Sequence, residues 1–156
     1  MCLDIMVKEK LYAKDLRIVT GLLKMTSDLE RIGDHAEDIM EYTLKLKQTP
    51  RVKVERIEKM TAIAISMVDD AILCYVKEDT DLANQVIARD DEVDRLYAEV
   101  QEELVLDLEN GIISPKFAIN TTFIVKYIER IADHAVNIAE WASYVKSGYY
   151  KDAKII

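Results

Sequence analysis

A twelve-residue phrase occurs twice in this chain, and it constrains the fold more than any other feature. Residues 30–41 read ERIGDHAEDIME, and residues 129–140, which lie 99 positions further on, read ERIADHAVNIAE. Eight of the twelve positions are identical, which chance does not supply in a chain this short. An internal repeat indicates that one structural unit is used twice. We therefore expect the two copies to form equivalent helices of two related helical bundles.

The repeated phrase also carries a resemblance to a known family. Glu-Arg-Ile-(Gly/Ala)-Asp-His-Ala, with Asn-Ile-Ala-Glu-Trp completing the second copy, resembles the PhoU family of phosphate-uptake regulators over residues 2–148. That family has two three-helix bundles, each ending in a helix with a Glu/Asp-x-x-x-Asp motif. Residues 10–17 resemble the family's connection into the third helix, with Leu11 in place of the usual proline. The resemblance implies an all-α fold of tandem three-helix bundles. The first bundle is then incomplete, because its first helix and most of its second are absent, and the second bundle is complete.

The resemblance also implies a function. Family members act as negative regulators of phosphate uptake and phosphate-starvation signalling, without being enzymes. Their partners are the ATPase subunit of the phosphate-specific ABC transporter and the phosphate-sensing histidine kinase. In the family, the acidic motifs bind clusters of metal ions, with iron or zinc seen there.

Composition limits the partners and the compartment. A net charge of −8 argues against nucleic acid as a ligand, because phosphate backbones are bound by clusters of Lys and Arg. Two cysteines provide neither a zinc motif nor a disulfide framework, so a reducing cytoplasm is the expected location. The apolar runs are far shorter than a membrane span, and the first ten residues do not resemble a signal peptide. Any contact with a membrane is therefore expected to be peripheral.

Periodicity and capping residues predict long helices and no strands. We expect the end of a helix over residues 1–11, followed by helices over residues 14–48, 51–76, 81–109 and 115–148. Thr49-Pro50 marks a domain boundary, because proline cannot continue a helix. The expected domains are thus a partial bundle over residues 1–48, a complete bundle over residues 51–148, and a tail over residues 149–156.

Apolar residues three and four apart predict which face of each helix is buried. In the helix over residues 14–48, the expected core positions are Leu22, Met25, Leu29, Ile32, Ala36 and Ile39. In the last helix they are Ile124, Ile128, Ile131, Ala135, Ile138, Ala142 and Val145. The seam from Leu22 to Ile39 lacks covering helices, so this helix is expected to dock against a second copy, the other bundle or a missing fragment, and we expect a homo-oligomer.

Acids at i, i+4 spacing form a candidate metal site. Three pairs have this spacing: Glu30 with Asp34, Asp90 with Asp94, and Glu129 with Asp133. Side chains four apart on a helix are neighbours, so two carboxylates can share an ion. Oxygen ligands favour hard ions such as magnesium, manganese or iron, and the family resemblance adds zinc. We expect the metal between Asp90/Asp94 and Glu129/Asp133, with all four acids facing outward; the alternative is an ordinary solvated acidic surface.

The two histidines of the repeat are relevant to whether the protein is a metal-dependent enzyme. His35 and His134 lie about 100° around the helix from the adjacent acids, so contact between helices is favoured over metal ligation. The residues three after Glu30 and Glu129 are Gly33 and Ala132, whereas di-iron carboxylate bundles need histidine there. A metal-dependent carboxylate enzyme and a purely structural helical module remain the alternatives to a regulator.

Overall fold

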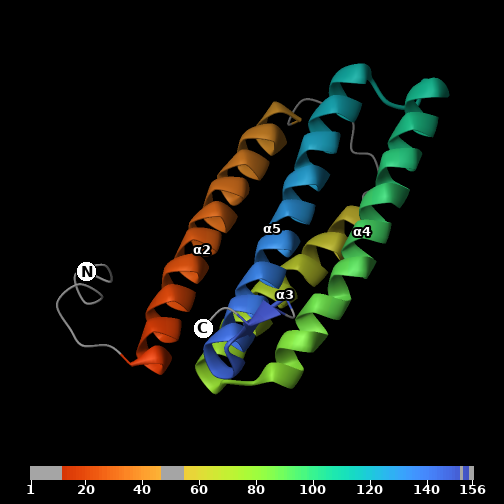
Figure 1. Cartoon of the computed structure of the whole chain (residues 1–156). Coiled ribbons are helices and arrows are strands. Elements are labelled where there is room, and N and C mark those ends of the chain that lie inside the picture. Colours follow the sequence, from red (N-terminus) through yellow and green to blue (C-terminus); the bar gives the residue numbers. More distant parts are fainter. Residues whose placement is uncertain (1–11, 47–54, 152, 155–156) are drawn as a thin grey trace.

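The computed structural model describes residues 12–46, 55–151 and 153–154, and these residues are mainly helical (Figure 1). Four long helices follow one another: α2 (Ala13–Lys45), α3 (Glu55–Lys77), α4 (Thr80–Glu109) and α5 (Pro115–Ser147). The all-α prediction is confirmed, and the described helix ends lie within a few residues of the expected ones. The expected helix end over residues 1–11 and the boundary at Thr49-Pro50 lie outside the described residues, so the division into domains stays a prediction.

Capping residues explain where α4 and α5 begin. The side chain of Asp79 accepts hydrogen bonds from the backbone N–H groups of Asp81 and Leu82, which satisfies donors that the first turn of α4 leaves free. Ser114 does the same for Phe117 at the start of α5, where Pro115 has the fixed φ that a first helical residue needs. At the other end, Gly148 has a φ of 82°, the left-handed conformation that ends helices.

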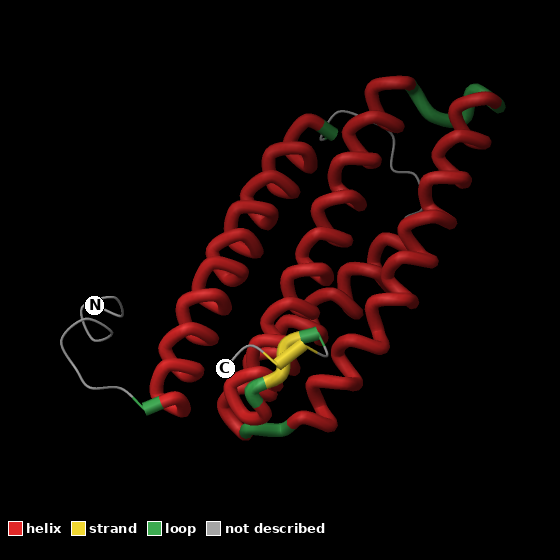
Figure 2. Tube along the Cα trace, viewed as in Figure 1, coloured by secondary structure: helices red, strands yellow, loops and turns green. Residues whose placement is uncertain are grey.

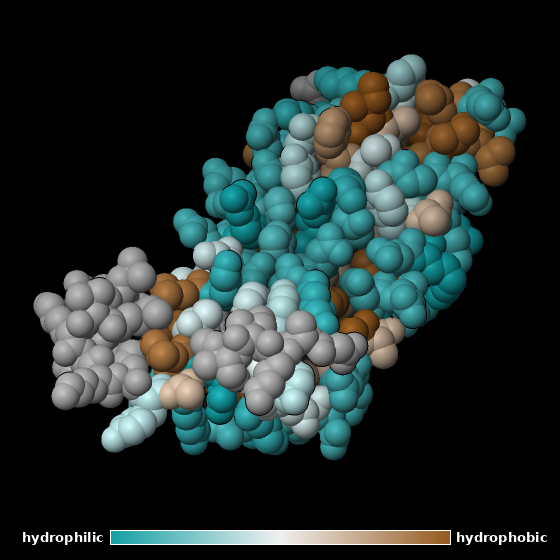
Figure 3. Space-filling model, viewed as in Figure 1, coloured by the Kyte–Doolittle hydropathy of each residue, from teal (hydrophilic) through white to brown (hydrophobic). Residues whose placement is uncertain are grey.

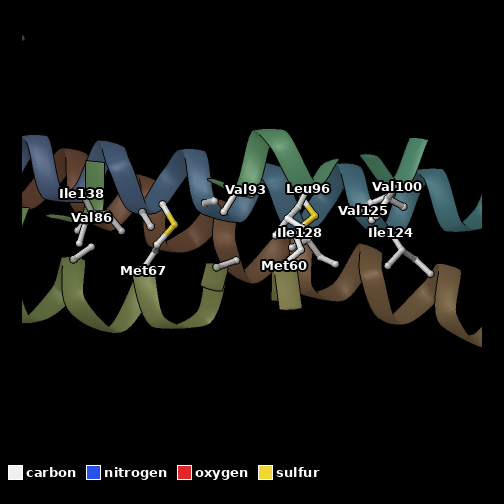
Figure 4. Packing of buried hydrophobic residues seen from close by; sticks show 14 of the residues in the cluster. Met60, Met67, Val86, Val93, Leu96, Val100, Ile124, Val125, Ile128 and Ile138 are labelled. Carbon is white, nitrogen blue, oxygen red and sulfur yellow. The ribbon is translucent and has the colours of Figure 1, made fainter. Parts of the chain in front are cut away.

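The main core lies between α3, α4 and α5, each of which contacts the other two. Figure 4 shows their apolar side chains meeting along the bundle axis. The α3 and α4 residues in this core include Met60, Ala64, Met67, Ala71, Cys74, Val86, Val93, Leu96 and Val100. From α5 come Ile124, Ile128, Ala135 and Ile138, as the periodicity of that helix predicts, while Ile131 packs at the edge.

Helix α2 contacts only α5 among the described elements. The contact surface has a spacing of alternating three and four residues, the repeat by which two helices stay in register along a shallow supercoil. It runs through Gly21, Met25, Asp28, Ile32, His35, Ile39 and Tyr42. The predictions of Met25, Ile32 and Ile39 are confirmed.

Three of the expected core positions on α2 are wrong. Leu22 and Leu29 are 39% and 40% exposed, and Ala36 is also exposed. The observed seam is rotated by about one residue, so Gly21, Asp28 and His35 occupy the places that the leucines and the alanine were expected to take. Polar and small residues replace apolar ones there because they make specific contacts with α5, described below.

A short hairpin follows α5, where the sequence pattern predicts no strand. Strand β1 (Tyr149–Tyr150) pairs antiparallel with β2 (Ala153–Lys154), with Tyr149 opposite Lys154 (Figure 2). The ring of Tyr150 stacks on Trp141 of α5 at a centroid distance of 3.9 Å. Two-residue strands are too short for a detectable alternation, which explains why the sequence did not indicate them. No helix in the described part of the chain has the length and apolar character needed to cross a bilayer.

Candidate functional site

Four of the six predicted acids come together on neighbouring helices. Asp90 and Asp94 lie on α4, and Glu129 and Asp133 lie on α5, which packs against it. Partial burial and, to a smaller extent, the charges of Asp94, Asp133 and Glu129 together raise the pKa of Asp90 to about 6. Burial and the charge of Glu129 also raise the pKa of Asp133, although Lys126 and Arg130 oppose the rise. The cluster therefore holds negative charge that its surroundings do not fully compensate.

Glu129 is the acid in this cluster with a close cation. Both of its carboxylate oxygens lie 2.7 Å from Nζ of Lys126, one turn earlier on α5, and Nε of Arg130 lies 4.0 Å away. The side chain of Glu129 is only 14% exposed. Glu129 and Asp133 are thus half-buried, and the expectation that they face outward is wrong for α5, because α4 packs beside them. That neighbour cannot be identified from the spacing within α5.

The remaining pair, Glu30 and Asp34, lies on the exposed side of α2. Neither forms an ion pair or hydrogen bond with another described residue. Outward orientation is as predicted for these two acids, but no described carboxylate faces them.

The acid cluster fits a hard cation in the chemistry of its donors. Its ligands are carboxylate oxygens, and its unbalanced charge is of the sign that a cation would stabilise. Within the described ranges, however, no three His, Cys, Asp or Glu side chains are placed closely enough to hold a metal ion together. Glu129 is directed to Lys126 instead, so ligation requires its side chain to leave that lysine.

A second polar group lies where α2 meets α5, and the sequence reasoning missed most of it. Nδ1 of His134 lies 2.8 Å from Oδ1 of Asp28, and Nδ2 of Asn137 donates to the same oxygen at 3.4 Å. His35 stacks on Tyr127 with a centroid distance of 5.4 Å, and its ring lies 5.5 Å from that of His134. Both histidines are therefore contacts between the two copies of the repeat. Asp28 could have been found from its spacing, since it lies three after Met25 and four before Ile32.

Two equivalent helices that carry the same acidic phrase and pack along each other define a class, the helical bundle with an internal repeat. Similarity to a known protein family shows which family this bundle belongs to. Residues 1–43 and 57–142 match the PhoU domain, so the chain belongs to the PhoU family. Both copies of the phrase fall within the matched ranges, and the resemblance inferred from them is confirmed.

Relatives in several bacteria bear this out. The chain is 38% identical to a phosphate-specific transport system accessory protein PhoU homolog of Aquifex aeolicus, over 87% of this chain and 62% of that protein. It is 31% identical to the homolog of Synechocystis sp., over 94% of this chain and 66% of that protein. The chain thus spans slightly less than two thirds of the length of each of these two relatives.

Solved structures agree with the fold. The crystal structure of PhoU from Pseudomonas aeruginosa superimposes with a TM-score of 0.88 at 32% identity, over 95% of this chain and 72% of that one. The phosphate transport system regulatory protein PhoU from Streptococcus pneumoniae gives a TM-score of 0.87 at 26% identity, over 97% and 72%. This likeness supports the arrangement of α2 against the bundle of α3, α4 and α5.

Proposed function

We propose that this chain is a regulator that limits phosphate uptake and phosphate-starvation signalling by binding other proteins. The observation that carries the proposal is the match to the PhoU domain over both halves of the chain, including both copies of the acidic phrase. The relatives are named accessory proteins of the phosphate-specific transport system. The partners that we propose are the ATPase subunit of the phosphate ABC transporter and the phosphate-sensing histidine kinase, in the cytoplasm.

The described structure suits a scaffold. Helix α5 contacts every other described helix, so it fixes the positions of α2, α3 and α4 relative to one another. Long helices held in this way present extended surfaces whose shape changes little on binding. Binding to such a surface therefore restricts the conformation of the partner and not that of the scaffold. In this mechanism, the effect of binding is a change in the activity of the transporter or the kinase.

We further propose that the acid cluster takes a divalent or ferric ion. Asp90, Asp94, Glu129 and Asp133 would hold it, with Glu30 and Asp34 as a weaker second position. The ion would supply positive charge that cancels the repulsion among these carboxylates. The protein's own residues contribute the half-buried setting, which strengthens the interaction of charges, and Lys126, which neutralises Glu129 when no ion is present.

Metal content and thermal stability test this second proposal together. Protein purified without chelators should contain the ion on elemental analysis, and adding Mn²⁺ or Fe³⁺ should raise the melting temperature. Glu129→Gln with Asp133→Asn should remove both effects, while Glu55→Gln with Asp69→Asn, two exposed acids on α3, should leave them unchanged. Equal metal content in both double variants would refute the cluster as the site.

The regulatory function is tested in cells that lack their own PhoU. The chain is expressed there and a phosphate-starvation reporter is measured in high phosphate. We expect the chain to restore repression of the reporter. Reporter output equal to that of the empty vector, with soluble protein present, would refute regulation by this chain.

A further inference from the structure

Apolar side chains are exposed at one end of the molecule, where α4 turns back into α5. We name this end, residues 104–123, the hairpin tip. Its exposed apolar side chains range from 37% exposed for Leu108 to 63% for Ile112, and they are Val105, Leu106, Leu108, Ile112, Ile119 and Phe123. In Figure 3 brown areas lie at the end where α4 and α5 join, whereas the middle of that face is teal. An apolar group of this size is unusual on a surface that serves no contact.

The hairpin tip extends beyond the described part of α3. Arg56, at the start of α3, bonds to Glu99 and Glu103 of α4, at 3.2 Å and 2.6 Å. The start of α3 is therefore level with Glu103, and the tip continues past it, as Figure 1 shows. Within the described residues α3 does not reach the tip, so the packing of α3 does not account for the apolar character of Ile112 and Ile119. Phe123, at the far end of the tip, stacks on Tyr42 of α2 at a centroid distance of 4.8 Å.

The charges around the tip are one-sided. The tip, residues 104–123, contains two acids, Asp107 and Glu109, and one base, Lys116, and two further acids, Glu102 and Glu103, lie just before it. Glu103 is paired with Arg56, whereas Glu102, Asp107 and Glu109 form no ion pair with a described residue. Three carboxylates in or just before the tip thus have no ion pair within the described residues, and Lys116 is the one base of the tip.

The end of α4 also departs from the usual charge pattern of a helix. The last turn of a helix carries a partial negative charge, which favours Lys and Arg there. Helices α2, α3 and α5 follow the rule with Lys45, Lys77 and Lys146, but the last turn of α4 has no basic residue. Asp107 and Glu109 stand there instead. A departure from the usual charge pattern of a helix end that no other described group offsets is typical of a functional surface.

We propose that the hairpin tip is the docking surface for a basic amphipathic segment of a partner protein. Apolar side chains of that segment would cover Ile112, Ile119 and their neighbours, and its Lys or Arg residues would meet Asp107 and Glu109. Charge excludes the other occupants: a second copy would bring its own acids against these, and an anionic membrane would repel them. This proposal rests on the proposed function, in which the chain acts by binding another protein. It adds the position of the binding surface and the chemistry of the segment that binds there.

The test uses the full chain and two synthetic helical peptides of about 18 residues, long enough to form a helix. One has a leucine face and a lysine face, and the other has glutamate in place of every lysine. Binding is followed by fluorescence anisotropy at low and at physiological salt. We expect the lysine peptide to bind, and the glutamate peptide to bind at least about tenfold more weakly, because like charges oppose it.

Variants locate the binding surface. Ile112→Gln with Ile119→Gln should weaken binding of the lysine peptide about tenfold, as loss of central apolar contacts does. Asp107→Asn with Glu109→Gln should weaken it about threefold at low salt and less at high salt. Ile65→Gln on α3 is the matched control, because Ile65 is as exposed as Ile119 but lies on another helix; it should leave binding unchanged. Circular dichroism of each variant establishes that it is folded.

Five outcomes would overturn the inference. Equal binding of the lysine peptide to the tip variants and to the Ile65→Gln control would place its site elsewhere, and equal binding of the glutamate peptide would refute the charge argument. A lower solution mass in the tip variants would make a second copy the occupant. Tip-dependent sedimentation with phosphatidylserine vesicles would make it a membrane. The phosphate-starvation reporter separates this result from the proposed function: repression that survives both tip variants refutes the tip alone.

Discussion

At residue 21, α2 and α5 come too close for a side chain to fit between them. A Cβ atom on Gly21 would clash with Cγ2 of Val145. Valine has few χ1 rotamers in a helix, so Val145 cannot simply turn aside. Gly33, on the same helix, is different: a Cβ there would meet nothing within 4 Å.

These two glycines give a matched pair of substitutions. Gly21→Ala should destabilise the protein by about 1–3 kcal/mol, as overpacking does. Gly33→Ala should stabilise it by about 0.5–1 kcal/mol, because alanine loses less backbone freedom in a helix than glycine. Urea unfolding of the two variants beside the wild type measures both changes. Destabilisation of equal size in both would show that the close approach of α2 and α5 is not responsible.

The pKa of Asp90 gives a pH prediction. Its folded value, about 6, lies above its unfolded value, so the folded protein binds more protons between about pH 4 and pH 6. The contribution of Asp90 to the free energy of unfolding therefore falls as the pH rises through this window, and it is constant above it. Asp90→Asn should be more stable than the wild type at pH 7, by about 1 kcal/mol once solvent screening of this partly exposed group is allowed for.

That advantage should disappear below about pH 4, where Asp90 is protonated in both states. Thermal unfolding in the presence of a chelator, at several pH values, measures the difference between variant and wild type. Asp69→Asn, at an exposed acid on α3, serves as the control for the replacement of an acid by an amide. A stability difference for Asp90→Asn that is the same at pH 3.5 and pH 7 would contradict the assignment.

Individual residues were only partly predictable from the sequence. The i, i+4 spacing indicated the acids correctly as pairs within one helix, because that relation depends on helix geometry alone. It could not show that Glu129 is held by Lys126, or that Asp28 meets His134, 106 positions away. Such contacts depend on side-chain conformation and on which helices become neighbours, and neither is encoded in a local pattern.

At the level of elements, the sequence was informative about helix ends and less so about α2. Asp79, Ser114-Pro115 and Gly148 each predict a boundary that the structure has, because capping is a local interaction. The buried face of α2 differs from the predicted one because glycine, aspartate and histidine, which apolar periodicity does not mark, lie in its contact with α5. A helix that packs on a single neighbour has a narrow seam, in which specific polar contacts can replace apolar burial.

The single neighbour of α2 predicts a difference in dynamics between helices. Helix α5 packs against α2, α3 and α4, whereas α2 packs against α5 alone in the described part of the chain. Local opening costs less where fewer apolar contacts break. Native-state hydrogen exchange should therefore show α2 opening at a lower free energy than α5. Gly21→Ala should lower protection in α2 further while leaving the centre of α4 unchanged; equal protection of α2 and α5 would contradict this order.

At the scale of the whole molecule, α2 shows a second apolar surface beside its seam. Leu22, Leu29, Met40 and Leu44 are all exposed and follow one another at intervals of seven, eleven and four residues, which keeps them on one side of the helix. Each large apolar side chain that stays in water forgoes about 1.5–3 kcal/mol of burial. This stripe is distinct from the hairpin tip, and near its end Lys45 pairs with Glu41.

We predict that the stripe on α2 causes the chain to self-associate in a concentration-dependent way. Two copies that pack their stripes together would each bury the exposed leucines, and a two-fold axis allows the same surface to serve both. Leu29→Gln with Met40→Gln should shift the equilibrium toward monomer. Ile65→Gln with Val76→Gln, two exposed apolar residues on α3, should not. Sedimentation velocity from low to high micromolar concentration measures the shift; a compact monomer over that whole range would show that α2 carries its apolar stripe without a second copy.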